Sequence, residues 1–183
     1  MMMRIILAIS VLGMVVFGCK KSEVNTDITQ AVLFEYEYVN HAWIYTHMGW
    51  MIDENGEVKG FTSPGNWKFT DDEGYISKED LESNLSQTDT SYFAISKDDI
   101  LNHFNERFDL LNGRIDTSDT FMADAGIGGL YVYVWNQQMN KYKKQVLATS
   151  GDISVTNSHH KAGTIISWLK GIGERTDRYY WIR

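Results

Sequence analysis

The histidines are the side chains in this sequence best suited to chemistry, because imidazole binds metals and transfers protons near neutral pH. His41 and His47 lie six positions apart in a strand-like run rich in aromatic and β-branched residues. At about 3.3 Å per residue, two side chains at that spacing on one face of a strand are about 20 Å apart, too far to bind one metal ion. We therefore expect each to be a packed or surface histidine.

An acidic segment, residues 69–81, resembles the calcium-binding loop of EF-hand proteins. Asp71 and Glu73 stand at ligand positions three and five, and Asp80 stands at position twelve. Position one is Phe69, which cannot bind a metal. An acidic turn followed by a capped helix explains the same residues, and we favour this interpretation. Asp71, Glu73 and Asp80 remain the only calcium candidates, and the sequence identifies no cofactor.

The remaining patterns favour structure over catalysis. His159 and His160 are adjacent at the start of an expected helix and would need ligands from elsewhere to bind zinc. The glycine-rich segment 124–129 leads into a strand-like run, whereas a phosphate-binding loop leads into a helix. The sequence has no G-x-S-x-G elbow, no H-E-x-x-H pair and no P-loop lysine. We therefore lean towards a protein that is not an enzyme.

Aromatic residues suggest a second kind of site, since they are numerous: six Trp, ten Tyr and eight Phe. Trp43, Tyr45, Trp50 and Trp67 lie close together in sequence. Exposed on one face, they would form a platform of the kind with which exported proteins bind sugars. Most aromatic residues of a domain are core residues, because each buries a large apolar area. We expect core packing for most of them and keep the platform as an alternative.

The elements that must position these residues begin with strands. Residues 31–38, 42–52 and 57–61 predict a three-stranded meander, with a tight turn at Asn55-Gly56. Residues 130–135 and 142–149 predict a second hairpin.

Three helices are expected between and after these strands. Ser77 and Ser96, each with an Asp three positions later, predict capped helices over 78–84 and from 97 to Leu111. A third helix, capped by Asn157 or Ser158, carries an apolar face that ends near Ile172. Strands and helices are segregated rather than alternating, so we predict one α+β domain over 31–183. Its antiparallel sheet would be built from the two hairpin or meander units, with about three helices on one face.

Composition excludes several classes of protein. The chain has 183 residues and a formal net charge of −7, with 24 acidic and 17 basic residues. A negative chain without a basic cluster argues against nucleic acid as a partner. Charged residues at 22% and a single Pro argue against disorder. One cysteine excludes an intramolecular disulfide and a multi-cysteine metal site.

That cysteine belongs to the most informative segment of the chain. A basic start at residues 1–4 is followed by an apolar run over 5–17 and then by Gly18-Cys19. Residues 16–19 resemble the lipobox of bacterial lipoproteins. The resemblance implies a signal peptide at 1–18, lipid on Cys19 and a polar tether over 19–30. It also implies a cell-envelope location, and Lys20 after the cysteine favours the outer membrane over the inner membrane. The alternative is that Lys20 and Lys21 belong to a solvated tether and have no role in sorting.

These observations lead to an expected function. We predict a membrane-anchored envelope lipoprotein of unknown specific function, held by lipid on Cys19. Its domain would be a non-catalytic binding or structural module with a protein, peptide or glycan ligand. One alternative is a small envelope hydrolase whose histidine and carboxylate residues converge in space. A second alternative is a calcium-stabilised domain, and a third is a buried, inert Cys19 without lipid.

Overall fold

The structure is a computed structural model that describes residues 29–42, 44–118 and 122–181. The predicted signal peptide, Cys19 and Trp43 lie outside the described residues. Within the described part there are nine strands and four helices. The strands are β1 (Val32–Asn40), β2 (Thr46–Asp53), β3 (Glu57–Thr62), β4 (Tyr75–Ile76), β5 (Thr90–Ala94), β6 (Ile115–Thr117), β7 (Ile127–Asn136), β8 (Lys141–Gly151) and β9 (Val155–Asn157). The helices are α1 (Lys78–Leu85), α2 (Lys97–Phe104), α3 (Arg107–Leu110) and α4 (Ala162–Gly173).

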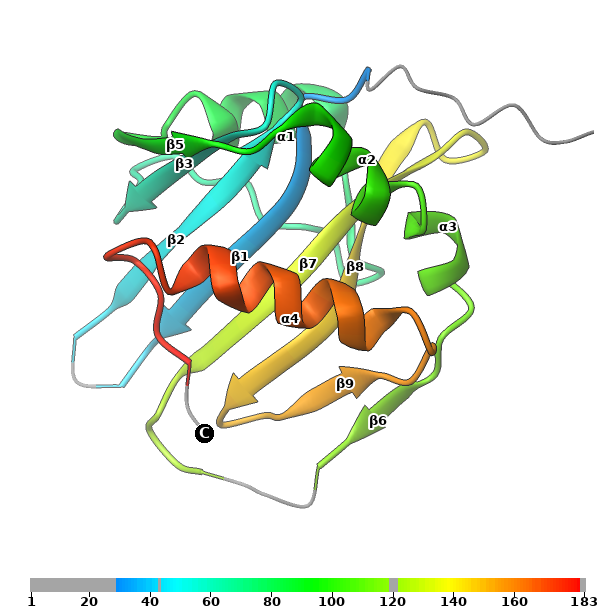
Figure 1. Cartoon of the computed structure of the whole chain (residues 1–183). Coiled ribbons are helices and arrows are strands. Elements are labelled where there is room, and N and C mark those ends of the chain that lie inside the picture. Colours follow the sequence, from blue (N-terminus) through cyan, green and yellow to red (C-terminus); the bar gives the residue numbers. More distant parts are fainter. Residues whose placement is uncertain (1–28, 43, 119–121, 182–183) are drawn as a thin grey trace, which may run out of the picture.

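All strands belong to one antiparallel sheet, shown face-on in Figure 1. Its order is β5-β3-β2-β1-β7-β8-β9-β6, and β4 pairs with β8 outside this path. The predicted meander is formed by β1, β2 and β3, and the predicted hairpin by β7 and β8. The two units join through the pairing of β1 with β7, which places β1 in the centre of the sheet. The predicted α+β class with an antiparallel sheet is confirmed.

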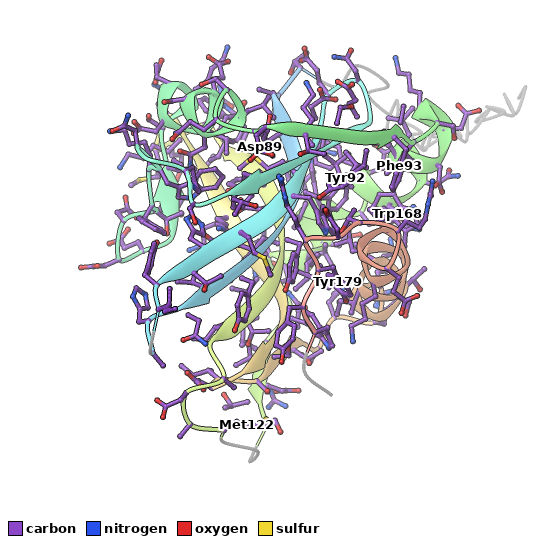
Figure 2. The ribbon with its side chains drawn as sticks, turned by 90° about the vertical axis from the view of Figure 1, so that its left-hand side faces the viewer. Asp89, Tyr92, Phe93, Met122, Trp168 and Tyr179 are labelled. Atoms are coloured by element: carbon purple, nitrogen blue, oxygen red, sulfur yellow. The ribbon has the colours of Figure 1, made fainter. Side chains whose placement is uncertain are left out.

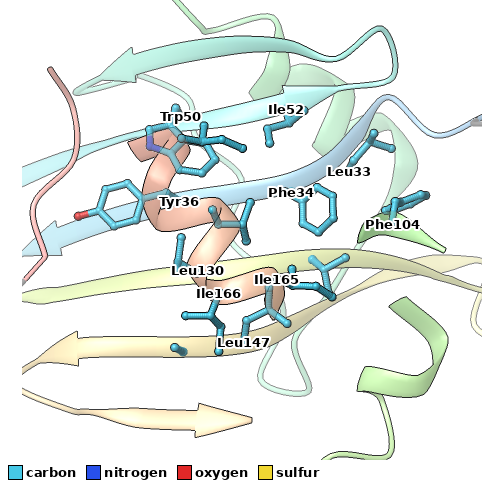
Figure 3. Close-up of a cluster of buried hydrophobic side chains, with 14 of the residues drawn as sticks. Leu33, Phe34, Tyr36, Trp50, Ile52, Phe104, Leu130, Leu147, Ile165 and Ile166 are labelled. Carbon is cyan, nitrogen blue, oxygen red and sulfur yellow. The ribbon is translucent and has the colours of Figure 1, made fainter. Parts of the chain in front are cut away.

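One face of the sheet carries the larger core. Helix α4 crosses this face, and its apolar stripe meets the buried side chains of the central strands (Figure 3). Tyr36 and Trp50 are stacked there with their ring centroids 5.9 Å apart. Helices α2 and α3 contribute to the same core through Ile100, Phe104 and Leu110. Three helices therefore cover this face, although α2 and α3 were predicted as a single helix.

The opposite face is covered by α1 and the segment before it. Leu81 of α1 packs with Phe61, Tyr133 and Tyr142 in a second, smaller core. Figure 2, viewed towards the β5 edge, places α1 and α4 on opposite sides of the sheet. Trp168 and Tyr179 lie on the α4 side. The helix predicted over 78–84 therefore exists but covers the other face.

Both predicted serine caps are confirmed. The Ser77 hydroxyl accepts a hydrogen bond from the Asp80 N–H at 3.0 Å, and that of Ser96 accepts from the Asp99 N–H at 3.3 Å. The helix predicted from 97 to Leu111 is divided into α2 and α3, and the carbonyl of Phe104 accepts from the Arg107 guanidinium at 2.9 Å.

The predicted cap of the last helix is wrong. Asn157 lies in β9, where its side-chain amide donates to the Leu110 carbonyl at 2.9 Å. Helix α4 begins later, at Ala162, without a side-chain cap. His159 and His160 consequently precede the helix, and their ring centroids are 4.4 Å apart. Among the described residues, no helix is both long and apolar enough to cross a membrane.

Candidate functional site

The face covered by α1 contains a buried group of ionisable side chains. Glu35 and Glu37 occupy alternate positions of β1, so both point to this face, away from α4. Glu35 is fully buried and Glu37 is 8% exposed. Buried carboxylates are costly unless they are paired and hydrogen-bonded, so their partners define the site.

Lys144 of β8 is the partner that both glutamates share. Its Nζ lies 3.0 Å from Glu35 Oε1 and 2.6 Å from Glu37 Oε2. The same ammonium lies 4.2 Å from the centre of the Tyr131 ring, a cation–π contact. The Tyr133 hydroxyl donates to Glu35 Oε2. We call Glu35, Glu37, Lys144, Tyr131 and Tyr133 the ion cluster.

Burial and charge act in opposite directions on these groups. Burial would raise the pKa of Glu37, but the Lys144 ammonium and a hydrogen bond from His47 lower it to about 2. Burial raises the pKa of Glu35 above its ordinary 4.5. Burial would lower the pKa of Lys144, but the two carboxylates raise it well above 10.5. Lys144 and Glu37 are therefore an ionised pair at neutral pH.

Glycines on both sides of Glu37 make room for aromatic rings. Gly49 of β2 and Gly129 of β7 are its two cross-strand neighbours. A Cβ on Gly129 would lie 2.1 Å from the Tyr131 hydroxyl oxygen, and a Cβ on Gly49 would lie 2.8 Å from Phe61 Cζ. The Tyr131 ring thus lies over the backbone of Gly129, and the Phe61 ring lies over that of Gly49.

His47 extends the cluster towards the surface. Its Nε2 lies 2.8 Å from Glu37 Oε1, and its side chain is 1% exposed. Three aromatic rings surround the imidazole, with centroids 5.3 Å away for Phe61, 5.0 Å for Trp67 and 5.5 Å for Phe69. Phe69 itself is 60% exposed. An exposed aromatic side chain therefore marks the surface above a buried histidine–carboxylate pair.

A pocket of about 200 Å³ opens beside this arrangement. Its floor is formed by Glu37, Tyr131, Tyr133 and Lys144 of the ion cluster. Its roof comes from the segment 67–76, which includes Trp67, Phe69 and Thr70. Asn84 of α1 fixes the roof: its side-chain amide accepts from the Lys68 N–H and donates to the Lys68 carbonyl, each at 2.8 Å. We call this the roofed pocket.

The prediction that His41 and His47 lie on one continuous strand is wrong. Strand β2 begins at Thr46, not at residue 42, and pairs Thr46 with Asn40. The chain therefore turns between the two histidines. Tyr45 lies between their rings, with centroids 5.2 Å from His41 and 6.3 Å from His47. The expectation that His47 is a packed histidine is confirmed by its burial.

The calcium candidates have other partners. Asp71 accepts from the Tyr75 N–H at 2.8 Å and pairs with Lys141 at 3.0 Å. Asp80 accepts from the Ser77 hydroxyl at 2.8 Å. Across the described residues, no three His, Cys, Asp or Glu side chains are arranged to hold a metal ion, so Asp71, Glu73 and Asp80 do not form such a group. The structure favours the acidic turn and capped helix.

The predicted aromatic platform is divided between the two faces of the sheet. Trp50 is fully buried under α4, whereas Trp67 lies at the roofed pocket. Tyr45, half exposed, is close to His47 on the pocket side. The sequence analysis considered Phe69 only as a residue that cannot bind calcium. In the structure Phe69 is the exposed aromatic residue at the pocket, whereas Trp50 is buried.

Sequence reasoning also missed the ion cluster. Its signal was present in β1, where two glutamates alternate with aromatic residues in a strand with buried neighbours on both sides. An acidic face on a central strand requires a buried cation, and Lys144 supplies it. Comparisons with protein-family models, curated proteins and solved structures give no match for this chain. Function must therefore be inferred from the geometry of the site.

Proposed function

We propose that the protein is an envelope lipoprotein, anchored by lipid on Cys19, whose domain binds a small ligand in the roofed pocket without transforming it. The anchor rests on the resemblance of residues 16–19 to a lipobox, and the outer membrane is the favoured location. The binding role rests on one observation. An ionised Glu37–Lys144 pair lines a pocket whose rim carries the exposed Phe69.

Binding is favoured over hydrolysis by the state of the groups at the pocket. Glu37 lies beside His47, as a hydrolase would require, but the Lys144 ammonium and His47 outweigh burial and hold its pKa at about 2. A carboxylate with so low a pKa is a weak general base near neutral pH. His47 is 1% exposed and does not line the pocket. The pair is thus better placed to stabilise the floor than to activate water.

Two experiments test this proposal. Replacing Cys19 with Ser should abolish labelling by radioactive palmitate and release the protein from the membrane fraction. Continued labelling and membrane retention would contradict the anchor.

Pocket occupancy is tested with the purified full chain in detergent. A library of small neutral, cationic and anionic compounds is screened by saturation-transfer NMR. We expect at least one compound to bind, and Thr70→Trp, which fills the pocket from its roof, to abolish that binding. Trp in place of the exposed Asn66 is the matched control. Binding that survives Thr70→Trp, or an absence of binding throughout the library, would contradict the binding role.

A further inference from the structure

Resting on the proposed binding function, we infer that the ligand of the roofed pocket is a neutral polyhydroxylated ring, a single sugar unit. Four aromatic rings line the pocket, those of Trp67, Phe69, Tyr131 and Tyr133. Phe69 contributes the most exposed of them at the rim. A flat apolar ring offers contact to the C–H face of a sugar, while the hydroxyl groups of the sugar need polar partners around its edge.

The polar groups of the pocket can supply those partners. One carboxylate oxygen of Glu37 contacts His47 and the other contacts Lys144, and each can accept a further hydrogen bond. Thr70 and Tyr131 also line the pocket, and a hydroxyl group both donates and accepts. Hydroxyl-rich ligands match such a mixed set better than ligands with only donors or only acceptors.

Charged ligands fit the same pocket less well. The Lys144 ammonium, which would attract an anion, already contacts two carboxylates and the face of Tyr131. A ligand ammonium seeking Glu37 or the Tyr131 ring would meet Lys144 at both places, because Nζ lies 2.6 Å from Glu37 Oε2 and 4.2 Å from the ring centre. The floor therefore offers neither a free cation nor a free anion.

Size limits the ligand to one ring inside the pocket. The volume of about 200 Å³ is smaller than that of pockets for drug-sized ligands, which begin near roughly 300 Å³. The ring could be a free monosaccharide or the end of a glycan chain. Both sources present the same chemistry, and the test separates them.

The inference is tested with the full chain in a detergent without a sugar headgroup. Saturation-transfer NMR is recorded with glucose, galactose, mannose and N-acetylglucosamine, and separately with ethanolamine and inorganic phosphate. We expect at least one monosaccharide to bind. Phe69→Ala and Thr70→Val should each weaken that binding at least tenfold. Phe108→Ala is the matched control, since Phe108 is 51% exposed on α3, and should leave binding unchanged. Unchanged melting temperatures would show that the variants are folded.

The outcomes separate the inference from the proposed function. In one outcome, ethanolamine or phosphate binds, this binding is lost in Thr70→Trp, and no monosaccharide binds. That outcome would overturn the inference of a sugar ligand but would leave the proposed binding function intact. Failure of every compound here and in the wider library would overturn both. Sugar binding that is insensitive to Phe69→Ala and Thr70→Val would place the sugar elsewhere and overturn the inference. Tighter binding of an oligosaccharide than of its terminal monosaccharide would identify a glycan chain as the source, and equal binding would identify the free sugar.

Discussion

Glu37 Oε2 and Lys144 Nζ lie 2.6 Å apart although 107 positions separate the two residues in sequence. Strand β7 lies between their strands, so the contact spans two strand spacings, about 10 Å in all. The long lysine side chain reaches from β8 towards β1 beside the Tyr131 ring and meets the Glu37 carboxylate there. The pair therefore links β1 to β8 across the centre of the sheet and also forms the floor of the roofed pocket.

Glu37→Gln should be strongly destabilising. The amide keeps the size of the side chain but removes the charge that faces Lys144. Its single oxygen can replace only one of the two carboxylate oxygens, because the amide nitrogen cannot accept a hydrogen bond from Lys144 or His47. Breaking a buried ion pair costs about 3–5 kcal/mol. We expect a loss of that order in the free energy of unfolding, measured by urea denaturation near neutral pH.

Glu35→Gln is the matched control for this prediction. Burial raises the pKa of Glu35, so its charge is the less favourable of the two, and an amide can still bond to Lys144 and Tyr133. We expect a loss of about 1 kcal/mol. Equal losses in the two variants would contradict the assignment of Glu37 as the ionised partner.

Acid should weaken the fold through Glu37. Its pKa falls from 4.5 in the unfolded chain to about 2 in the folded chain, because Lys144 and His47 outweigh burial. A lowered pKa contributes stability that is present above pH 4.5 and is lost as the pH falls towards 2. The contribution of Glu35 to stability has the opposite pH dependence, because its pKa is raised on folding. That contribution is present below pH 4.5 and is lost as the pH rises through the raised pKa of the folded chain.

The variants separate these two contributions. Urea denaturation between pH 5 and 2.5 should show a shallower loss of stability in Glu37→Gln than in the natural chain, and a steeper loss in Glu35→Gln. Other carboxylates titrate alike in all three proteins, so they cancel in the comparison. Parallel profiles would refute a special role for Glu37 in acid.

Gly129→Ala should displace the Tyr131 ring. The new Cβ would lie 2.1 Å from the hydroxyl oxygen and 2.4 Å from Cζ of Tyr131, so the ring must move off the Lys144 ammonium. Overpacking of this kind costs about 1–3 kcal/mol. The double variant Gly129→Ala/Tyr131→Ala should lose less stability than the sum of the single variants, because it removes the clash. Strict additivity in thermal or urea denaturation would show that the ring does not cover Gly129.

Local sequence patterns predicted most of the sheet and the start of two helices. The alternation in β1, the hairpin of β7 and β8, and the caps at Ser77 and Ser96 depend on neighbours within a few residues, which a single sequence displays. The wrong start of β2 has a local cause too: the sequence at 41–45 is as rich in aromatic residues as a strand, but β2 begins only at Thr46.

The candidate site could not be predicted in the same way. The partnership of Glu37 with Lys144 depends on β7 lying between β1 and β8, and that order is set by long-range pairing. The side of the sheet covered by α1 is likewise a tertiary choice, because the apolar residues of a short helix can face either side. Phe69 reaches His47 only because the segment 67–76 folds over the sheet.

Asn84→Ala should loosen the roof of the pocket. Asn84 is 1% exposed, and its amide makes both hydrogen bonds that join α1 to the backbone of Lys68. Losing two hydrogen bonds costs about 1–3 kcal/mol, reduced where water can replace them. We expect faster hydrogen exchange at the Lys68 amide and weaker ligand binding, with the sheet amides unchanged. Gln87→Ala, which removes one exposed bond to the Asn66 N–H, is the control and should change exchange only at Asn66. Unaltered exchange at Lys68 in Asn84→Ala would mean that the roof is held by its aromatic contacts alone.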